Sequence, residues 1–213
     1  RDFKLKFDFQ KTTDDAYLDT YGYSGSDRLK SSIEISRTRL DEYFSAGVIR
    51  YESLRVSEDD DTQPALIFDV EYEKRLHPKA LGGEIRLGFN AHHHYRTSTL
   101  DVDGSDDDTL VDGRDMTRIS TEMSWHRRWT LAGGLRAGVS TYLWADRYMV
   151  AEDATSLSDA QQITPAAAVE LRWPWRKTGA DGARYLIEPV AQAAWVGGKN
   201  LNVAIDESTR VEF

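Results

Sequence analysis

The chain has 213 residues, a formal net charge of −9, 40% hydrophobic residues and no cysteine. This length and composition favour one folded domain over a disordered segment, and the acidic balance disfavours a nucleic-acid partner. The lack of cysteine excludes disulfides, cysteine-zinc sites and thiol catalysis.

Hydropathy excludes a helical membrane protein, because no stretch approaches the roughly 18 consecutive apolar residues that a spanning helix needs. The mean hydropathy of −0.58 does not argue against spanning strands. Such strands need only about ten residues, of which alternate ones are apolar. Because the chain starts at Arg1 without a signal peptide and stops at Phe213 inside an apparent strand, we expect a section of a longer protein.

Alternation of apolar and polar residues with period two predicts strands along the whole chain. In the first segment Phe3, Leu5, Phe7 and Phe9 share one parity. Further strands are predicted at 29–40, 42–54, 65–75, 85–95, 118–125, 135–146, 169–173 and about 184–196. Several have ten residues or more, longer than the usual strand of about five or six. Strand length and alternation together favour an all-β, antiparallel transmembrane β-barrel segment of about nine or ten strands.

The links between the predicted strands alternate in length. Long polar links are expected at 12–28, 55–64, 97–114 and 147–162, and shorter ones near Asp41 and at 77–83, 130–134 and 174–183. Outer-membrane barrels have short periplasmic turns and long extracellular loops. The last short link is nearly as long as a long one, and a soluble β-sandwich is the alternative that also produces alternating strands.

No group of residues predicts an enzyme. His92 and His94 share one strand face, where a polar row is favoured over a metal site that lacks further ligands. The acidic stretches 59–61 and 101–108 are interpreted as solvated loops, since neither has the spacing of a calcium loop. We find no G-x-S-x-G motif or catalytic triad context, and we expect no cofactor.

Aromatic residues gather in three places that fit interfacial girdles, with core or turn packing as the alternative. They are Tyr142, Trp144 and Tyr148; Trp125 and Trp129; and Trp173 and Trp175.

Several stretches resemble the LptD family, the lipopolysaccharide-assembly outer-membrane proteins also called the organic solvent tolerance protein family. They are DDAYLDTYGYS at 14–24, DRLKS at 27–31, SLR at 53–55, GGE at 82–84, ELRWP at 170–174, LIEPVAQ at 186–192 and DESTRVEF at 206–213. Residues 204–208 depart from the pattern that many relatives share. The resemblance covers nearly the whole chain.

The resemblance implies that residues 1–213 are part of a single outer-membrane β-barrel domain, from the N-terminal half of a very large barrel. A periplasmic jellyroll domain precedes the barrel in such proteins and is absent from this chain. The expected function is that of an outer-membrane translocon component that assembles lipopolysaccharide into the outer leaflet, without enzyme activity. The expected partners are lipopolysaccharide, an LptE-like lipoprotein plug, the periplasmic lipopolysaccharide-transport bridge and outer-membrane lipid.

An alternating strand would turn its polar residues to the barrel lumen. The lumen-facing candidates are Glu84, Arg86, Arg118, Glu122 and Arg136. The alternatives in function are a general porin or substrate channel, a soluble carbohydrate-binding β-sandwich, and an outer-membrane enzyme.

Overall fold

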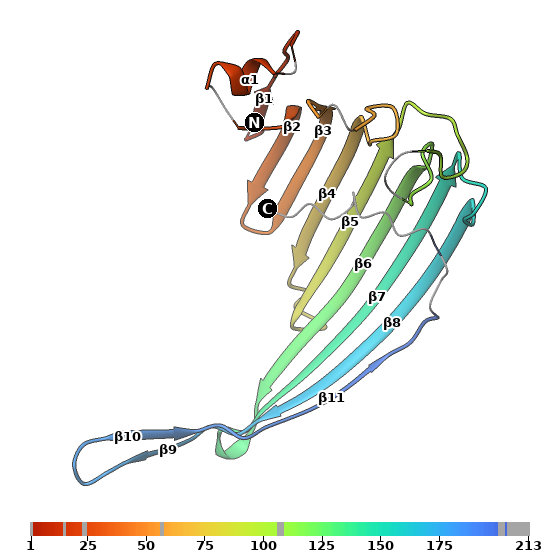
Figure 1. The fold of residues 1–213 in the computed structure, drawn as a ribbon. Coiled ribbons are helices and arrows are strands. Elements are labelled where there is room, and N and C mark those ends of the chain that lie inside the picture. Colours follow the sequence, from red (N-terminus) through yellow and green to blue (C-terminus); the bar gives the residue numbers. More distant parts are fainter. Residues whose placement is uncertain are drawn as a thin grey trace.

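The computed structural model describes residues 2–14, 16–22, 25–55, 58–105, 109–199 and 203, with only the backbone of residue 19. These residues form a nine-stranded antiparallel sheet, in the order β1-β2-β3-β4-β5-β6-β7-β8-β11, and a separate ribbon of β9 and β10 (Figure 1). The fold class is therefore all-β, as predicted. The motif at 206–213 and the departure at 204–208 lie outside the described residues.

The strands follow one another around the sheet, each paired with its neighbour in sequence up to β8. Their bounds are β1 Lys4–Asp8, β2 Arg28–Arg39, β3 Glu42–Ser53, β4 Leu66–Leu76, β5 Glu84–Tyr95, β6 Asp115–Thr130, β7 Arg136–Ala151, β8 Asp159–Arg172, β9 Trp175–Thr178, β10 Arg184–Ile187 and β11 Val190–Val196. The helical turns are α1, Tyr17–Thr20, and the short 3-10 turn η1, Ala132–Gly134. From β2 to β8 the strands have 11 to 16 residues, enough for the roughly 9–11 that cross a bilayer.

The strand register confirms the predicted alternation. Ile33 on β2 lies opposite Val48 on β3, and Val48 lies opposite Phe68 on β4. Because paired residues point to the same face of a sheet, these side chains form one apolar face. Asp69 and the other polar residues that alternate with the apolar ones along each strand point to the opposite face.

Paired glycines shape two of the tight turns. Gly82 and Gly83 precede β5 with φ of 67° and 76°, and Gly133 and Gly134 precede β7 with φ of 70° and 77°. Left-handed backbone of this kind favours glycine. At Gly83 a Cβ atom would also lie only 2.2 Å from the carbonyl oxygen of His126, so a side chain is excluded on both counts.

Three predicted boundaries are wrong. The link predicted at 147–162 is largely strand, because β7 continues to Ala151 and β8 begins at Asp159. Residues 159–162 have no apolar alternation that would mark them as a strand, and pairing with β7 forms their ladder. The link at 174–183 contains β9, and the strand predicted at 184–196 is broken at Pro189, which has no N–H to donate.

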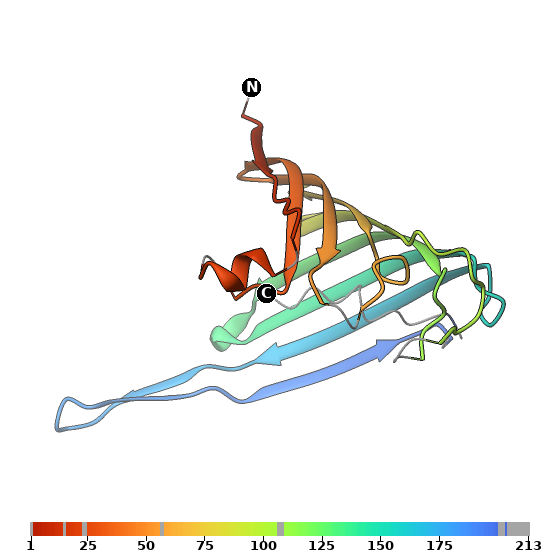
Figure 2. The same cartoon turned by 45° about the horizontal axis from the view of Figure 1, so that its top comes forward.

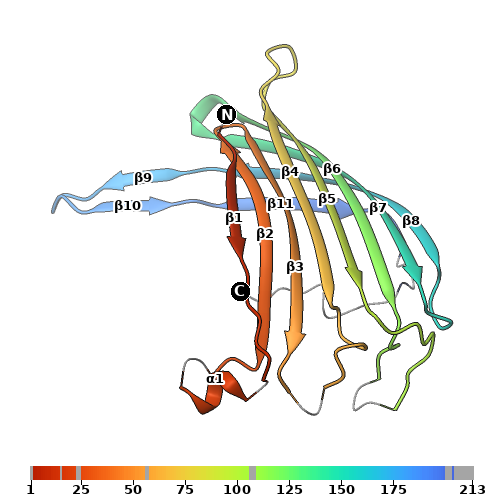
Figure 3. The same ribbon diagram turned by 90° about the horizontal axis from the view of Figure 1, so that it is seen from above.

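The sheet is curved and forms one layer (Figures 2 and 3). Among the described residues the buried apolar side chains are few: Leu29, Ile67, Val111, Met116, Val150, Ala160 and Ala166. Large apolar side chains on the apolar face remain about half exposed, for example Met123 at 51% and Ile33 at 52%. A soluble domain would bury such a face under a second layer. Within the described part of the chain, no helix has the length and apolar character needed to cross a membrane.

Candidate functional site: the polar face of the sheet

The polar face contains a hollow of about 510 Å³ that extends from β4 to β8. Gly88 lies near its middle, opposite Glu73 on β4 and Glu122 on β6. Because glycine adds no side chain, space remains between the two glutamates. The charged residues that line the hollow are Glu71, Glu73, Glu122 and Asp146 with Arg86 and Arg118. The hollow is therefore hydrophilic with a negative balance.

Hydrogen bonds hold one side of the hollow in place. Arg118 donates from Nε to the Ser120 hydroxyl at 3.0 Å, and its Nη2 lies 3.4 Å from an oxygen of Asp146. Ser120 donates to the same carboxylate. The guanidinium of Arg118 also lies over the Tyr148 ring, 5.4 Å from its centroid. These contacts fix the Arg118 side chain against the sheet.

Trp144 lines the hollow on β7, where its ring stacks on that of Tyr142. Tyr142 and Trp144 are parallel to within 7°, with centroids 5.1 Å apart, and the Trp144 indole N–H donates to Glu122 at 3.0 Å. The girdle predicted at this place is wrong. Tyr142, Trp144 and Tyr148 have the parity of Asp146, so all three lie on the polar face, and the stacked pair lies in the middle of β7. The sequence already shows that these three aromatic residues share the parity of Asp146, and this parity would have predicted their position on the polar face.

The predicted lumen-facing residues all lie on the polar face, as their register shows. Arg86, Arg118 and Glu122 line the hollow. Glu84 lies outside it at the start of β5, where it accepts a hydrogen bond from Arg86 and has His77 within 3.3 Å. Arg136 lies at the start of β7, opposite Arg172. The structure thus brings three of the five together at one site.

His92 and His94, on the polar face of β5, belong to a polar chain near the long loops. Asp69 lies 2.7 Å from Nδ1 of His92, Nε2 of His92 lies 3.4 Å from His94, and Arg96 lies 3.1 Å from the far nitrogen of His94. His94 is fully buried. Among the described residues no cluster of three or more histidine and carboxylate side chains is placed to hold a metal ion.

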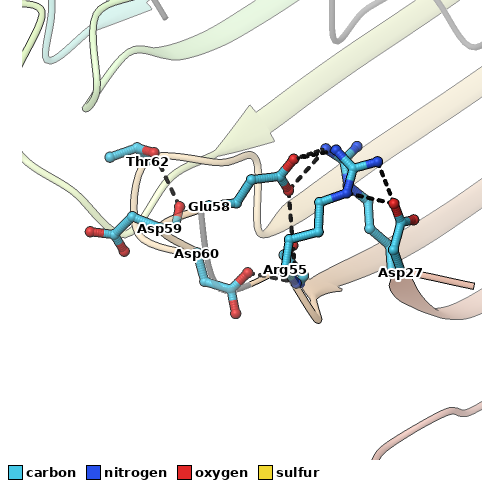
Figure 4. A network of polar contacts seen from close by, with 8 residues as sticks. Asp27, Arg55, Glu58, Asp59, Asp60 and Thr62 are labelled. Atoms are coloured by element: carbon cyan, nitrogen blue, oxygen red, sulfur yellow. Dashed lines mark hydrogen bonds and ion pairs between the residues drawn. The ribbon is translucent and has the colours of Figure 1, made fainter. Parts of the chain in front are cut away.

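Ion pairs link the first two long loops (Figure 4). Arg28, at the start of β2, makes two hydrogen bonds to the Glu58 carboxylate, and Arg55 contacts both Glu58 and Asp27. Burial alone would raise the pKa of the Glu58 carboxyl, but hydrogen bonds from Arg28, Ser53 and Arg55 outweigh it and lower the pKa to about 2.

The remaining long loops are linked in the same way. Arg96 donates from Nε to the Thr62 carbonyl at 2.9 Å, which ties the loop after β5 to the loop after β3. Arg114 contacts Asp153 at 2.7 Å, with side-chain exposures of 9% and 0%, which ties the loop after β5 to the loop after β7. Burial raises the pKa of Asp153, but hydrogen bonds from Thr155, Ser156 and Arg114 lower it to about 2. The long loops therefore form one connected layer at their end of the sheet.

Tryptophan side chains mark the opposite end, where the turns are tight. The indole N–H of Trp125 donates to the Gly82 carbonyl at 2.9 Å, and that of Trp173 donates to the Gly133 carbonyl at 3.0 Å. Trp129 lies on the apolar face with Trp125. The predicted position of Trp125, Trp129 and Trp173 near the strand ends is therefore confirmed.

One layer of long antiparallel strands with an apolar face, a hollow polar face and no covering layer among the described residues defines a segment of a transmembrane β-barrel. A sequence model of the LptD family, described as LPS transport system D, matches residues 1–213. Because that match covers the whole chain, the chain belongs to the LptD family. A search of curated proteins found no match.

Proposed function

We propose that this chain is part of the outer-membrane translocon that assembles lipopolysaccharide into the outer leaflet. The family supports a role in lipopolysaccharide transport. The single observation that carries the proposal is the division of one sheet into an apolar face and a polar face with a hollow. A glycolipid has the same division, since its acyl chains suit lipid and its sugars suit a hydrated interior.

In this proposal the polar face lines the lumen and its hollow meets the sugar part of the substrate. The four carboxylates that line the hollow accept hydrogen bonds from hydroxyl groups. They also repel phosphate, because acidic side chains outnumber the two arginines. Trp144 adds a flat apolar surface at the same place. The walls therefore suit a sugar chain that has to pass without being held.

The proposed function breaks no bond and requires no catalytic group. Within the proposal, residues 1–213 belong to the N-terminal half of a single barrel domain in the cell outer membrane. An LptE-like lipoprotein plug and the periplasmic transport bridge are proposed partners. Lumen-facing roles are proposed for Glu84, Arg86, Arg118, Glu122 and Arg136.

Depletion of the full-length protein tests the function. We expect surface lipopolysaccharide to fall while other outer-membrane barrels still insert. A porin would instead show loss of small-solute uptake, and a lipid-modifying enzyme would show altered lipid structure with export intact. Normal surface lipopolysaccharide on depletion would overturn the proposal.

Photo-crosslinking tests the site. A crosslinking residue in place of Asn90, which lines the hollow, should capture lipopolysaccharide during export. The matched control is Met123 on β6, which lies on the apolar face opposite Leu87. Capture at Met123 with none at Asn90 would reverse the proposed faces.

A further inference from the structure

The ribbon of β9 and β10 stands apart from the main sheet. Its four residue pairs run from Trp175 opposite Ile187 to Thr178 opposite Arg184, and it forms a sheet of its own. It continues beyond the tight-turn end of β8 and β11 and projects away from the other strands in all three views (Figures 1, 2 and 3).

The ribbon exposes an unusual amount of apolar surface. All of its strand residues are exposed, and the large apolar side chains are exposed by 49% at Trp175, 56% at Tyr185, 71% at Leu186 and 63% at Ile187. An isolated two-stranded ribbon is marginally stable in water. A surface that covers these side chains would stabilise it.

Charge indicates which surface this is. Between 175 and 187 the ribbon has three basic residues, Arg176, Lys177 and Arg184, against the single acidic residue Asp181, although the chain as a whole has a net charge of −9. In the long loops, at 9–27, 54–65, 96–114 and 152–158, sixteen acidic residues outnumber four basic ones. The ribbon is thus a local basic and aromatic segment in an acidic chain. Basic and aromatic residues together are typical of membrane-interface anchors.

The base of the ribbon lies at the depth of lipid headgroups if the tryptophans at the tight turns mark the edge of the hydrocarbon. Trp175 is two residues beyond Trp173, or about 7 Å along a strand and about 5 Å in depth at a tilt of roughly 45°. The headgroup layer is about 5–8 Å thick on each side. Trp173 and Trp175 also contact each other, with ring centroids 5.2 Å apart, so the aromatic surface is continuous.

We propose that the β9–β10 ribbon is an interfacial anchor that binds anionic phospholipid headgroups of the leaflet at the tight-turn end. Arg176, Lys177 and Arg184 pair with lipid phosphates, and Trp175 and Ile187 enter the headgroup layer. This inference rests on the proposed membrane placement and is independent of the substrate.

A lipid-quenching experiment on the full-length protein tests the anchor. A fluorophore is attached to the cysteine of the variant Thr178→Cys, and the 213 residues contain no other thiol that would compete for the label. The protein is inserted in vesicles of phosphatidylcholine, with or without an equal share of phosphatidylglycerol, and each contains a headgroup nitroxide quencher. We expect strong quenching in the anionic vesicles and weak quenching in the neutral ones.

Charge removal provides the second arm. Each basic side chain near an anionic surface favours contact by about fivefold. The triple variant Arg176→Gln, Lys177→Gln and Arg184→Gln should therefore lower the ratio of bound to free ribbon by roughly a hundredfold. A matched triple variant at the long-loop end, Lys11→Gln, Lys30→Gln and Arg50→Gln, should leave quenching unchanged.

The outcomes separate the anchor from the membrane placement. Protein that does not insert, as judged by protease protection, would refute the membrane placement and the anchor with it. Inserted protein without quenching in either lipid would refute the anchor alone and would point to a protein partner. Equal quenching in both lipids, unchanged in the triple variant, would also refute it, since contact would not depend on charge.

Discussion

Replacement of Leu143 by arginine tests which face of the sheet meets lipid. Leu143 lies near the middle of the 16-residue strand β7, on the apolar face between Met123 and Pro165, and is 46% exposed. A cation at the midplane of the lipid face costs about 2–4 kcal/mol, and the cost falls to about 0–1 kcal/mol near the interfaces.

The position along the strand sets the magnitude. At a rise of about 3.3 Å per residue and a tilt of roughly 45°, each residue changes depth by about 2.3 Å. Ala137 is on the same face of β7, and its distance from Leu143 in sequence corresponds to a change in depth of about 14 Å. Leu143→Arg should therefore lower the free energy of unfolding by about 2–4 kcal/mol, and Ala137→Arg by about 1 kcal/mol or less.

The polar face supplies the matched control. Gln162 on β8 lies opposite Asp146, so Gln162→Arg places the same cation on the hydrated face beside a carboxylate. We expect a change of about 1 kcal/mol or less, the range for an ion pair in water. The measurement is denaturant unfolding of the full-length protein in lipid vesicles. A cost for Gln162→Arg equal to that for Leu143→Arg would refute the face assignment, and equal costs at Ala137 and Leu143 would refute the depth argument.

Three further predictions follow from the loops and the hollow. Cysteines at Ser26 and Ser105, both exposed in long loops, should react with a membrane-impermeant reagent on intact cells, and labelling only after permeabilisation would reverse the topology. Because the folded pKa of Glu58 is depressed from 4.5 to about 2, its ionised form contributes stability that is present above pH 4.5 and is lost as the pH falls toward 2. Proteolysis of loop 54–65 should therefore increase in that window and should depend less on pH in Glu58→Gln, whereas identical profiles would contradict the ion-pair network. Gly88→Leu should fill the hollow and reduce lipopolysaccharide export with the protein level unchanged, and Ala91→Leu on the apolar face should not; equal export in both variants would contradict a role for the hollow.

The sequence was sufficient to predict the faces of the strands. Side chains alternate in any extended strand, so the parity of Ile33, Phe68 or Met123 fixes a face without knowledge of the partner strand. The candidate lumen residues share one face for the same reason. Which of them meet in space depends on register between strands, and register is not local. Arg86 therefore reaches the hollow while Arg136, with the same parity, does not.

Polar strand ends and aromatic rings were harder to predict. Residues 159–162 have the sequence Asp-Ala-Gln-Gln, which is typical of a loop, and they are strand only because β7 offers a paired backbone. Tyr142 and Trp144 were assigned by their residue type to an interface, although their parity places them on the polar face. Where residue type and parity disagree in an amphipathic strand, geometry decides, because no rotamer carries a side chain to the other face.

The same geometry makes the register of the sheet decisive for function. A slip of one residue would move Arg86 or Arg118 to the lipid face and Leu87 to the hollow, at a cost of about 2–4 kcal/mol for each cation near the midplane. Two contacts oppose such a slip between β5 and β6: the close approach of Gly83 to the His126 carbonyl and the Trp125 bond to Gly82. Both contacts lie at the tight-turn end, where no connection joins these two strands, so these contacts fix the register there. The long-loop end has the connection itself, and its ion pairs join neighbouring loops instead. The tight-turn end thus sets which residues face lipid, and the long loops remain free to carry the acidic surface.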